Sequence, residues 1–233
     1  MTELSQSLEK EVLHKNQTYG VFPIPISTFR VPDHDKVKQQ ILKWMKDQEL
    51  NPDHARKSIS HNVVEIGKTN DLLNTLPDLK ETLLSLVSTH NDNSFNYTSR
   101  TDIVESYLEL AQEQAIYAPH EHANSVYSCT YFINFDNSIH SSLKFRRHIF
   151  STFYPSLQLP SSQQTPFNMP EVLVPHTEGD LLIYPSNLTH GYESNPSDQR
   201  ITLSFNIAPV WCFPQLRGVF HNYLEICGVF AYN

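Results

Sequence analysis

Residues 200–210, RITLSFNIAPV, decide the fold class of this 233-residue chain. Apolar residues occupy every second position, and a charge, hydroxyls and an amide occupy the positions between them. Successive side chains of a β-strand point to opposite faces of the sheet, so this alternation predicts a strand with one apolar and one polar face. The apolar positions are Ile201, Leu203, Phe205 and Ile207, and the polar ones are Arg200, Thr202, Ser204 and Asn206.

Strand-like runs of the same kind precede this stretch. Residues 126–133, VYSCTYFI, alternate in the same way, and residues 180–185, DLLIYP, are typical of a short buried strand that a proline ends. The cluster SNPSDQ at residues 194–199 predicts a turn. Short strands separated by turns favour an antiparallel sandwich or jelly-roll barrel over a parallel α/β sheet.

The N-terminal part of the chain has a different pattern, and we expect mainly helices and one strand there. Residues 21–31, VFPIPISTFRV, are rich in strand formers, but their prolines restrict them to an edge strand or an irregular strand. Residues 35–48, DKVKQQILKWMKDQ, carry apolar side chains every four positions, which predicts a helix. A second helix is expected after Pro77.

The chain shows no internal repeat and no linker that divides it. Residues 1–18 are polar and charged, which predicts a flexible N-terminus, and residues 19–233 are expected to form a single domain. Within this domain, residues 137–172 are rich in Pro, Ser and Gln and lack periodicity. Such a long excursion inside a β domain indicates a loop or lid insertion, either functional or a surface insertion without a role.

Composition excludes several classes of protein. The net charge of −8 disfavours nucleic acid as a partner, and no apolar run is long enough for a membrane span. Three widely spaced cysteines indicate a reducing, cytoplasmic location rather than a disulfide framework. The apolar tail at residues 216–233 is expected to form either a packing segment or the interface of a homodimer.

Histidine is the residue type in which we expect the chemistry. In residues 117–125, YAPHEHANS, His120 and His122 stand two positions apart. On a strand they share one face while Glu121 points to the other, so the pair is a candidate for two metal ligands. His190, which follows a buried strand and a proline turn, is the best candidate for a third ligand. Hydrogen-bonded surface histidines are the alternative interpretation of each piece alone.

Ten residues beyond His190, Arg200 and Thr202 share one strand face. A guanidinium fork offers a carboxylate two charge-assisted hydrogen bonds, and a neighbouring hydroxyl offers a third. The pair is therefore a candidate binding site for a carboxylate. An arginine on the exposed face of an edge strand is the alternative.

These residues resemble the pattern of the 2-oxoglutarate/Fe(II)-dependent dioxygenases: HxD/E, a distal His, and about ten residues later an Arg with a hydroxyl residue two positions on. The run YAPHEH also resembles the Tyr-x-x-His-x-Asp run of prolyl-hydroxylase-like members. Four segments carry the resemblance to a group of members with HxH in place of HxD. They are VFPIPI, PHEHANSVYSCTYFIN, GDLLIYPSNLTH and RITLSFNIAP.

This resemblance implies a mainly β fold with flanking helices, namely a double-stranded β-helix (jelly-roll) barrel with an N-terminal helical addition. It implies Fe(II) held by His120, His122 and His190, with 2-oxoglutarate as cosubstrate bound by Arg200 and Thr202. The reaction it implies converts 2-oxoglutarate and O2 to succinate and CO2 while a substrate is hydroxylated. The substrate, a small molecule or a protein, is not implied.

The chain departs from the family pattern at two positions. The usual carboxylate ligand is replaced by His122, which makes the implied site all-histidine. Prolyl-hydroxylase-like members also often carry a cosubstrate-binding tyrosine nine residues before the first histidine, where this chain has Ala111. Tyr131, on the following strand, is the candidate replacement.

Two further hypotheses stay open at this level. A cupin-type metalloprotein without 2-oxoglutarate would use the same histidines, because GDLLIYPSNLTHGYESN resembles the second cupin motif, but it would have no specific need of Arg200. A degenerate, non-catalytic barrel would act as a binding module and hold no stoichiometric metal.

Overall fold

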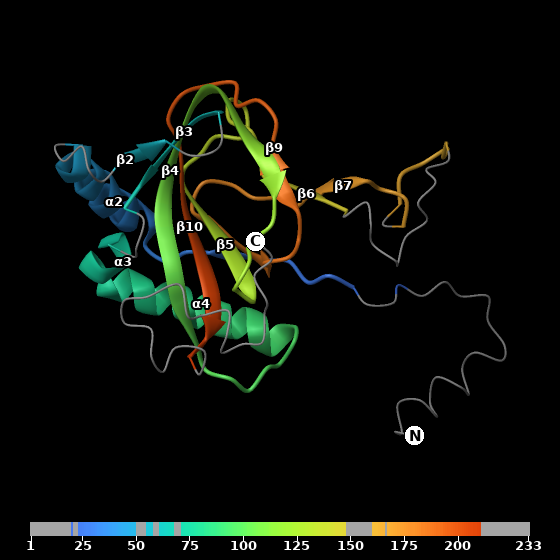
Figure 1. Ribbon diagram of the computed structural model, residues 1–233, viewed down its shortest axis with the longest axis horizontal. Helices are drawn as coiled ribbons and strands as arrows, with labels where there is room; N and C mark the ends of the chain where they lie inside the picture. The colour runs from blue at the N-terminus through green and yellow to red at the C-terminus, as the bar shows by residue number, and fades with distance from the viewer. Residues whose placement is uncertain are drawn as a thin grey trace, which may run out of the picture.

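The computed structural model describes residue 20 and residues 23–49, 55–57, 61–67, 71–147, 160–165 and 167–210 (Figure 1). Ten strands form an antiparallel sheet system, and helices flank it on one side. The helices are α2 (His34–Glu49), α3 (Asp71–Thr75) and α4 (Pro77–Asn93). The strands are β1 (Ser27–Arg30), β2 (Ala55–Lys57), β3 (His61–Ile66), β4 (Thr101–His120), β5 (Tyr127–Asn134), β6 (Lys144–Arg146), β7 (Glu171–Leu173), β8 (Asp180–Pro185), β9 (His190–Tyr192) and β10 (Arg200–Pro209).

The strands make two sheets that share β4. The major sheet has the order β1-β8-β5-β10-β4, with β3 and β2 continuing beyond β4, and the minor sheet has the order β4-β9-β6-β7. All pairs are antiparallel. This arrangement confirms the predicted jelly-roll class with an N-terminal helical addition. Strand β1, in the proline-containing segment, lies at the edge of the sheet as predicted.

Strands β5 and β10 are buried on both faces because the major sheet lies between two apolar clusters. The outer cluster joins the sheet to the helices, as in the contact of Leu203 and Tyr131 with residues such as Leu83. The inner cluster, with Phe132 and Tyr184, fills the space between the two sheets. The alternation along residues 200–210 therefore sends its apolar side chains to the helices and its polar ones into the barrel.

A β-bulge interrupts β4 shortly before its end. Tyr117 pairs with Tyr192 and His120 with His190, so three steps along β4 correspond to two along β9. The extra residue shifts the phase of the alternation, and Tyr117 and His120 come to the same face, with ring centroids 4.5 Å apart. The bulge thus turns the end of β4 so that His120 faces the barrel.

Three short strands escape the sequence patterns. Strands β2 and β3 lie in the part where one strand and helices were predicted, and β3 pairs with β4. Strand β6 lies within the proposed insertion 137–172 and pairs with β9, so part of that segment is a barrel wall. The predicted flexible terminus 1–18 and the apolar tail 216–233 lie outside the described residues. No helix among the described residues is both long and apolar enough to cross a bilayer.

Candidate metal and cosubstrate site

Three histidines meet where the end of β4 pairs with the start of β9. The ring centroids of His120 lie 5.0 Å from His122 and 4.5 Å from His190, and those of His122 and His190 lie 5.1 Å apart. One ring nitrogen from each lies within 4.8 Å of the others, which makes the trio a candidate metal-binding group. The fold therefore brings together the three histidines that the sequence singled out.

The backbone explains how the trio is assembled. His120 ends β4 and His190 begins β9, and the two residues pair directly across the minor sheet. Next to them, a Cβ atom at Gly191 would lie 2.4 Å from the backbone oxygen of Tyr117, so only glycine allows the two strands to approach this closely. The backbone N–H of His122 donates to the carbonyl of Ser186 at 2.9 Å, which fixes the residue after the strand has ended.

Backbone carbonyls orient two of the imidazole rings. Nδ1 of His120 lies 2.8 Å from the carbonyl oxygen of Ala118, and Nδ1 of His190 lies 2.8 Å from that of Leu188. A carbonyl only accepts, so Nδ1 carries the proton in both rings. Their Nε2 atoms therefore present lone pairs, as a metal ligand requires.

The third ring is held from the opposite wall. The amide nitrogen of Asn206 donates to Nδ1 of His122 at 3.1 Å, and Ser128 donates to the amide oxygen of Asn206 at 2.9 Å. In this pairing His122 carries its proton on Nε2. The same amide nitrogen donates to Oε2 of Glu105 at 3.2 Å, so binding of a metal through Nε2 of His122 requires this amide to turn and to give up that contact.

Burial favours the neutral form of two of the three rings. Burial and the neighbouring His120 lower the pKa of His122 to about 4. Burial, His120 and His122 lower the pKa of His190 to about 3, against a smaller opposing effect of the Leu188 carbonyl. Neutral imidazoles are the form that binds metal ions.

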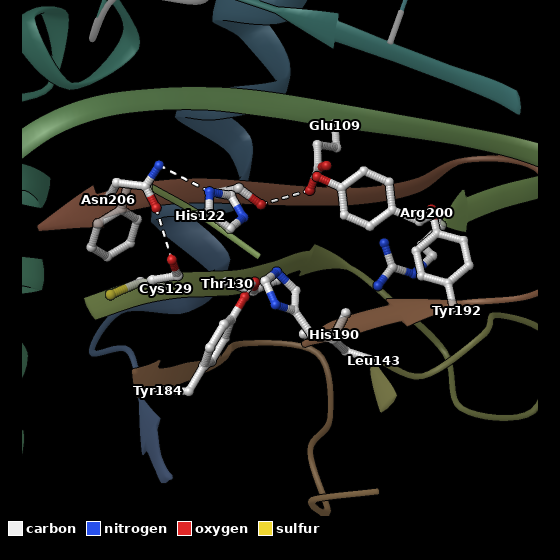
Figure 2. Close-up of a pocket in the computed structure, with 14 residues that line it drawn as sticks. Glu109, His122, Cys129, Thr130, Leu143, Tyr184, His190, Tyr192, Arg200 and Asn206 are labelled. Carbon is white, nitrogen blue, oxygen red and sulfur yellow. Dashed lines mark hydrogen bonds between the residues drawn. The ribbon is translucent and has the colours of Figure 1, made fainter. Parts of the chain in front are cut away.

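Arg200 occupies the same cavity as His122 and His190, as Figure 2 shows. Its side chain is only 1 % exposed, and its guanidinium carbon lies 4.4 Å from the centroid of the Tyr192 ring. Nε donates to the backbone oxygen of Ser141 at 2.9 Å. Within the described part of the chain no carboxylate forms an ion pair with Arg200. A buried cation without a carboxylate partner is costly, which makes this position a fit for an anionic ligand.

Thr202 lies in the barrel interior beside Arg200, but its hydroxyl already has a partner. It donates to Oε2 of Glu109 at 3.1 Å, and the hydroxyl of Ser204 donates to the same oxygen at 2.6 Å. Glu109 lines the cavity with Arg200 and is 4 % exposed. Glu109 was not among the residues singled out from the sequence, although its charge inside the otherwise strand-like run SYLELA was a signal for it.

Tyr131 does not reach the cavity. Strand alternation turns it toward the helices, where its hydroxyl lies 2.7 Å from Nδ1 of His34. The tyrosines beside Arg200 and His120 are instead Tyr192 and Tyr117, which stack with centroids 5.7 Å apart. Glu121 points away from the cluster and accepts a hydrogen bond from Thr189 at 2.6 Å, as strand geometry predicted.

The fold and the site together define a jelly-roll protein with a three-histidine cluster and a buried arginine in one cavity. In sequence, residues 105–206 match the family model described as "Putative 2OG-Fe(II) oxygenase", a segment that contains the cluster and Arg200. The family match confirms, over this segment, the resemblance to the 2-oxoglutarate/Fe(II) oxygenases found in the sequence. No curated protein matches the chain in sequence.

Solved structures share the fold at low sequence identity. The non-heme α-ketoglutarate-dependent epimerase SnoN from nogalamycin biosynthesis is 13 % identical, with a TM-score of 0.58 over 80 % of this chain and 77 % of its own. HygX from Streptomyces hygroscopicus, with nickel, 2-oxoglutarate and hygromycin B bound, is 11 % identical, with a TM-score of 0.54 over 94 % and 95 %. A prolyl hydroxylase from Trichoplax adhaerens, in complex with a hypoxia inducible factor peptide fragment, is 10 % identical, with a TM-score of 0.54 over 78 % and 82 %.

Proposed function

We propose that this chain hydroxylates a C–H bond of a small-molecule or protein substrate, with His120, His122 and His190 as the ligands of Fe(II). The reaction consumes 2-oxoglutarate and O2 and releases succinate and CO2. When bound, the metal supplies the redox chemistry and the open coordination positions at which 2-oxoglutarate and O2 meet.

In this proposal Arg200 binds the distal carboxylate of 2-oxoglutarate. Its guanidinium fork forms two parallel hydrogen bonds with a carboxylate, and Tyr192 below the fork holds its plane. Aromatic side chains close the cavity: the Tyr184 ring centroid lies 4.8 Å from that of His190, and Phe145 packs edge-on against Tyr184. These walls exclude water, which strengthens each electrostatic contact inside.

The observation that supports the proposal most is the buried Arg200 in the same cavity as the histidine cluster. A metal-binding barrel without 2-oxoglutarate, such as a cupin-type protein, has no reason to keep an unpaired guanidinium 1 % exposed beside its metal site. A non-catalytic barrel has no reason to keep three neutral imidazoles turned toward one point. The oxygenase hypothesis accounts for both features.

The test is an anaerobic titration of the purified protein with Fe(II) and 2-oxoglutarate. We expect a weak visible metal-to-ligand charge-transfer band, and on admission of O2 a release of succinate even without the substrate. His190→Ala is expected to abolish the band and the metal binding. His61→Ala removes an exposed histidine of β3 and serves as the matched control. A wild-type protein that binds Fe(II) but shows neither the band nor 2-oxoglutarate binding would refute the proposal.

A further inference from the structure

Glu109 is a buried acid that the proposed reaction leaves without a role. It comes from the inner face of β4, opposite Thr202 on β10, and is 4 % exposed in the wall of the metal and cosubstrate cavity. Its Oε2 accepts hydrogen bonds from Ser204 at 2.6 Å and Thr202 at 3.1 Å. Its Oε1 is buried and has no hydrogen-bond partner among the described residues.

The hydrogen bonds show that the strand opposite is built to hold this carboxylate. A threonine or serine hydroxyl has a single proton, and both hydroxyls donate this proton to the same oxygen of Glu109. The two hydrogen bonds fix the position of the carboxylate in the cavity wall. Thr202 therefore orients Glu109, and Arg200 meets the cosubstrate carboxylate without the proton of this hydroxyl.

The sum of the charges in the site with metal and cosubstrate bound indicates a role for the Glu109 carboxylate. This inference rests on the proposed function. In a site with the usual HxD/E motif, the charges of Fe(II) and the arginine balance those of 2-oxoglutarate and the ligand carboxylate. In this chain His122 stands where that carboxylate would be, so the filled site would keep one positive charge in excess. Glu109 carries one negative charge in the same cavity, where an uncompensated charge is costly.

We propose that Glu109 balances the charge of this all-histidine site from the cavity wall, in place of a carboxylate among the metal ligands. Only the three histidines have ligand atoms that converge on one point, and Glu109 is not part of this group. The effect of Glu109 on the metal ion is therefore electrostatic. Glu109 thus favours a divalent cation at the cluster and disfavours the dianionic cosubstrate at Arg200.

The experiment compares Glu109→Gln with the wild type by calorimetry, first with Co(II) and then with 2-oxoglutarate added anaerobically to the Co(II)-loaded protein. Glutamine keeps the shape and one acceptor oxygen, so the substitution removes mainly the charge. We expect Co(II) to bind about 10- to 100-fold more weakly, the effect typical of residues that support metal ligands. We expect 2-oxoglutarate to bind equally or more tightly, because a like charge has left its pocket.

Ser204→Ala is the matched control, since it removes a hydrogen bond to Glu109 and leaves the charge in place. Co(II) affinity within about threefold of the wild type is expected for it, well below the change from a lost ligand-supporting residue. An unchanged Co(II) affinity in Glu109→Gln would overturn the proposal. Equal losses of Co(II) and 2-oxoglutarate affinity, or a loss in Ser204→Ala as large as in Glu109→Gln, would do the same, because they indicate a packing defect.

His122→Asp gives a second test that holds even if Glu109→Gln does not fold. Returning a carboxylate to the ligand position should tighten Co(II) binding and weaken 2-oxoglutarate binding, and it should make Glu109 dispensable for the metal. A His122→Asp variant that binds 2-oxoglutarate as tightly as the wild type would contradict the charge balance. If the wild type binds Co(II) but no 2-oxoglutarate, the proposed function fails, while the Co(II) ratio still decides the role of Glu109.

Discussion

Replacing Arg200 by methionine should change the stability of the fold little and the affinity for 2-oxoglutarate greatly. The guanidinium is 1 % exposed, its Nε donates to the carbonyl of Ser141, and it has no acidic partner among the described residues. Methionine has a similar length and no charge, so Arg200→Met removes a desolvated cation together with its hydrogen bonds. These effects oppose each other, and we expect the melting temperature to change by only a few degrees.

The effect on the ligand is expected to be far larger. Removing one partner of a buried, hydrogen-bonded ion pair costs about 3–5 kcal/mol. At about 1.4 kcal/mol for each factor of ten, the affinity of Arg200→Met for 2-oxoglutarate should fall by at least about 100-fold. The histidine cluster is untouched, so metal binding should persist.

Anaerobic calorimetry with the Co(II)-loaded protein measures this change. A second ligand, 2-oxobutyrate, shares the 2-oxo acid end but lacks the distal carboxylate, and should bind wild type and Arg200→Met about equally. Arg30→Met is the matched variant, because the ion pair of Arg30 with Asp180 is exposed and such pairs contribute little. If Arg200→Met bound 2-oxoglutarate within threefold of the wild type, the assignment of Arg200 as the carboxylate anchor would be wrong.

Three further predictions concern the walls of the site and the stability of the fold. Gly191→Ala should lower the stability by about 1–3 kcal/mol, measured by denaturant unfolding, because its Cβ would lie 2.4 Å from the oxygen of Tyr117; full stability would contradict the close approach. Asn206→Ala should weaken Co(II) binding about 10-fold through the loss of the contact that orients His122, and an unchanged affinity would show that the contact is dispensable. Burial lowers the pKa of His90 below 6.5 in the folded protein. Below pH 6.5 the unfolded chain therefore binds more protons than the folded protein, and the free energy of unfolding falls as the pH falls. His90→Gln should lessen this slope by up to about 1.4 kcal/mol per pH unit, and a slope identical to that of the wild type would exclude His90 as a cause.

The alternation of side chains along a single strand predicted correctly which residues share a face. The alternation along residues 200–210 predicted which side chains share a face, and the structure buries Arg200 and Thr202 together on the polar one. The pair His120 and His122 followed from the same two-residue period. Strands β2 and β3 were missed because they are short and are stabilised by pairing with each other and with β4. A short segment of sequence does not show such pairings.

Tyr131 was predicted to face the site, but it lies on the opposite face of β5. The alternation along β5 was clear, but both faces of this strand are buried and aromatic or apolar, so the pattern did not tell which face meets the site. The helices cover the face with Tyr131, and the barrel interior receives Thr130 and Phe132. The bulge before His120 likewise depends on the pairing of β4 with β9, which joins residues about seventy positions apart.

The sequence by itself determined the strand class of the fold, the three histidines and the arginine, because side-chain alternation and motif spacing are properties of short segments. Only the tertiary structure decided that these residues share one cavity, that Tyr131 lies outside it, and that Glu109 lies within. Burial and electrostatic proximity arise from segments distant in the chain that pack together. The charge of a site is a sum over all of them, and no single stretch contains it.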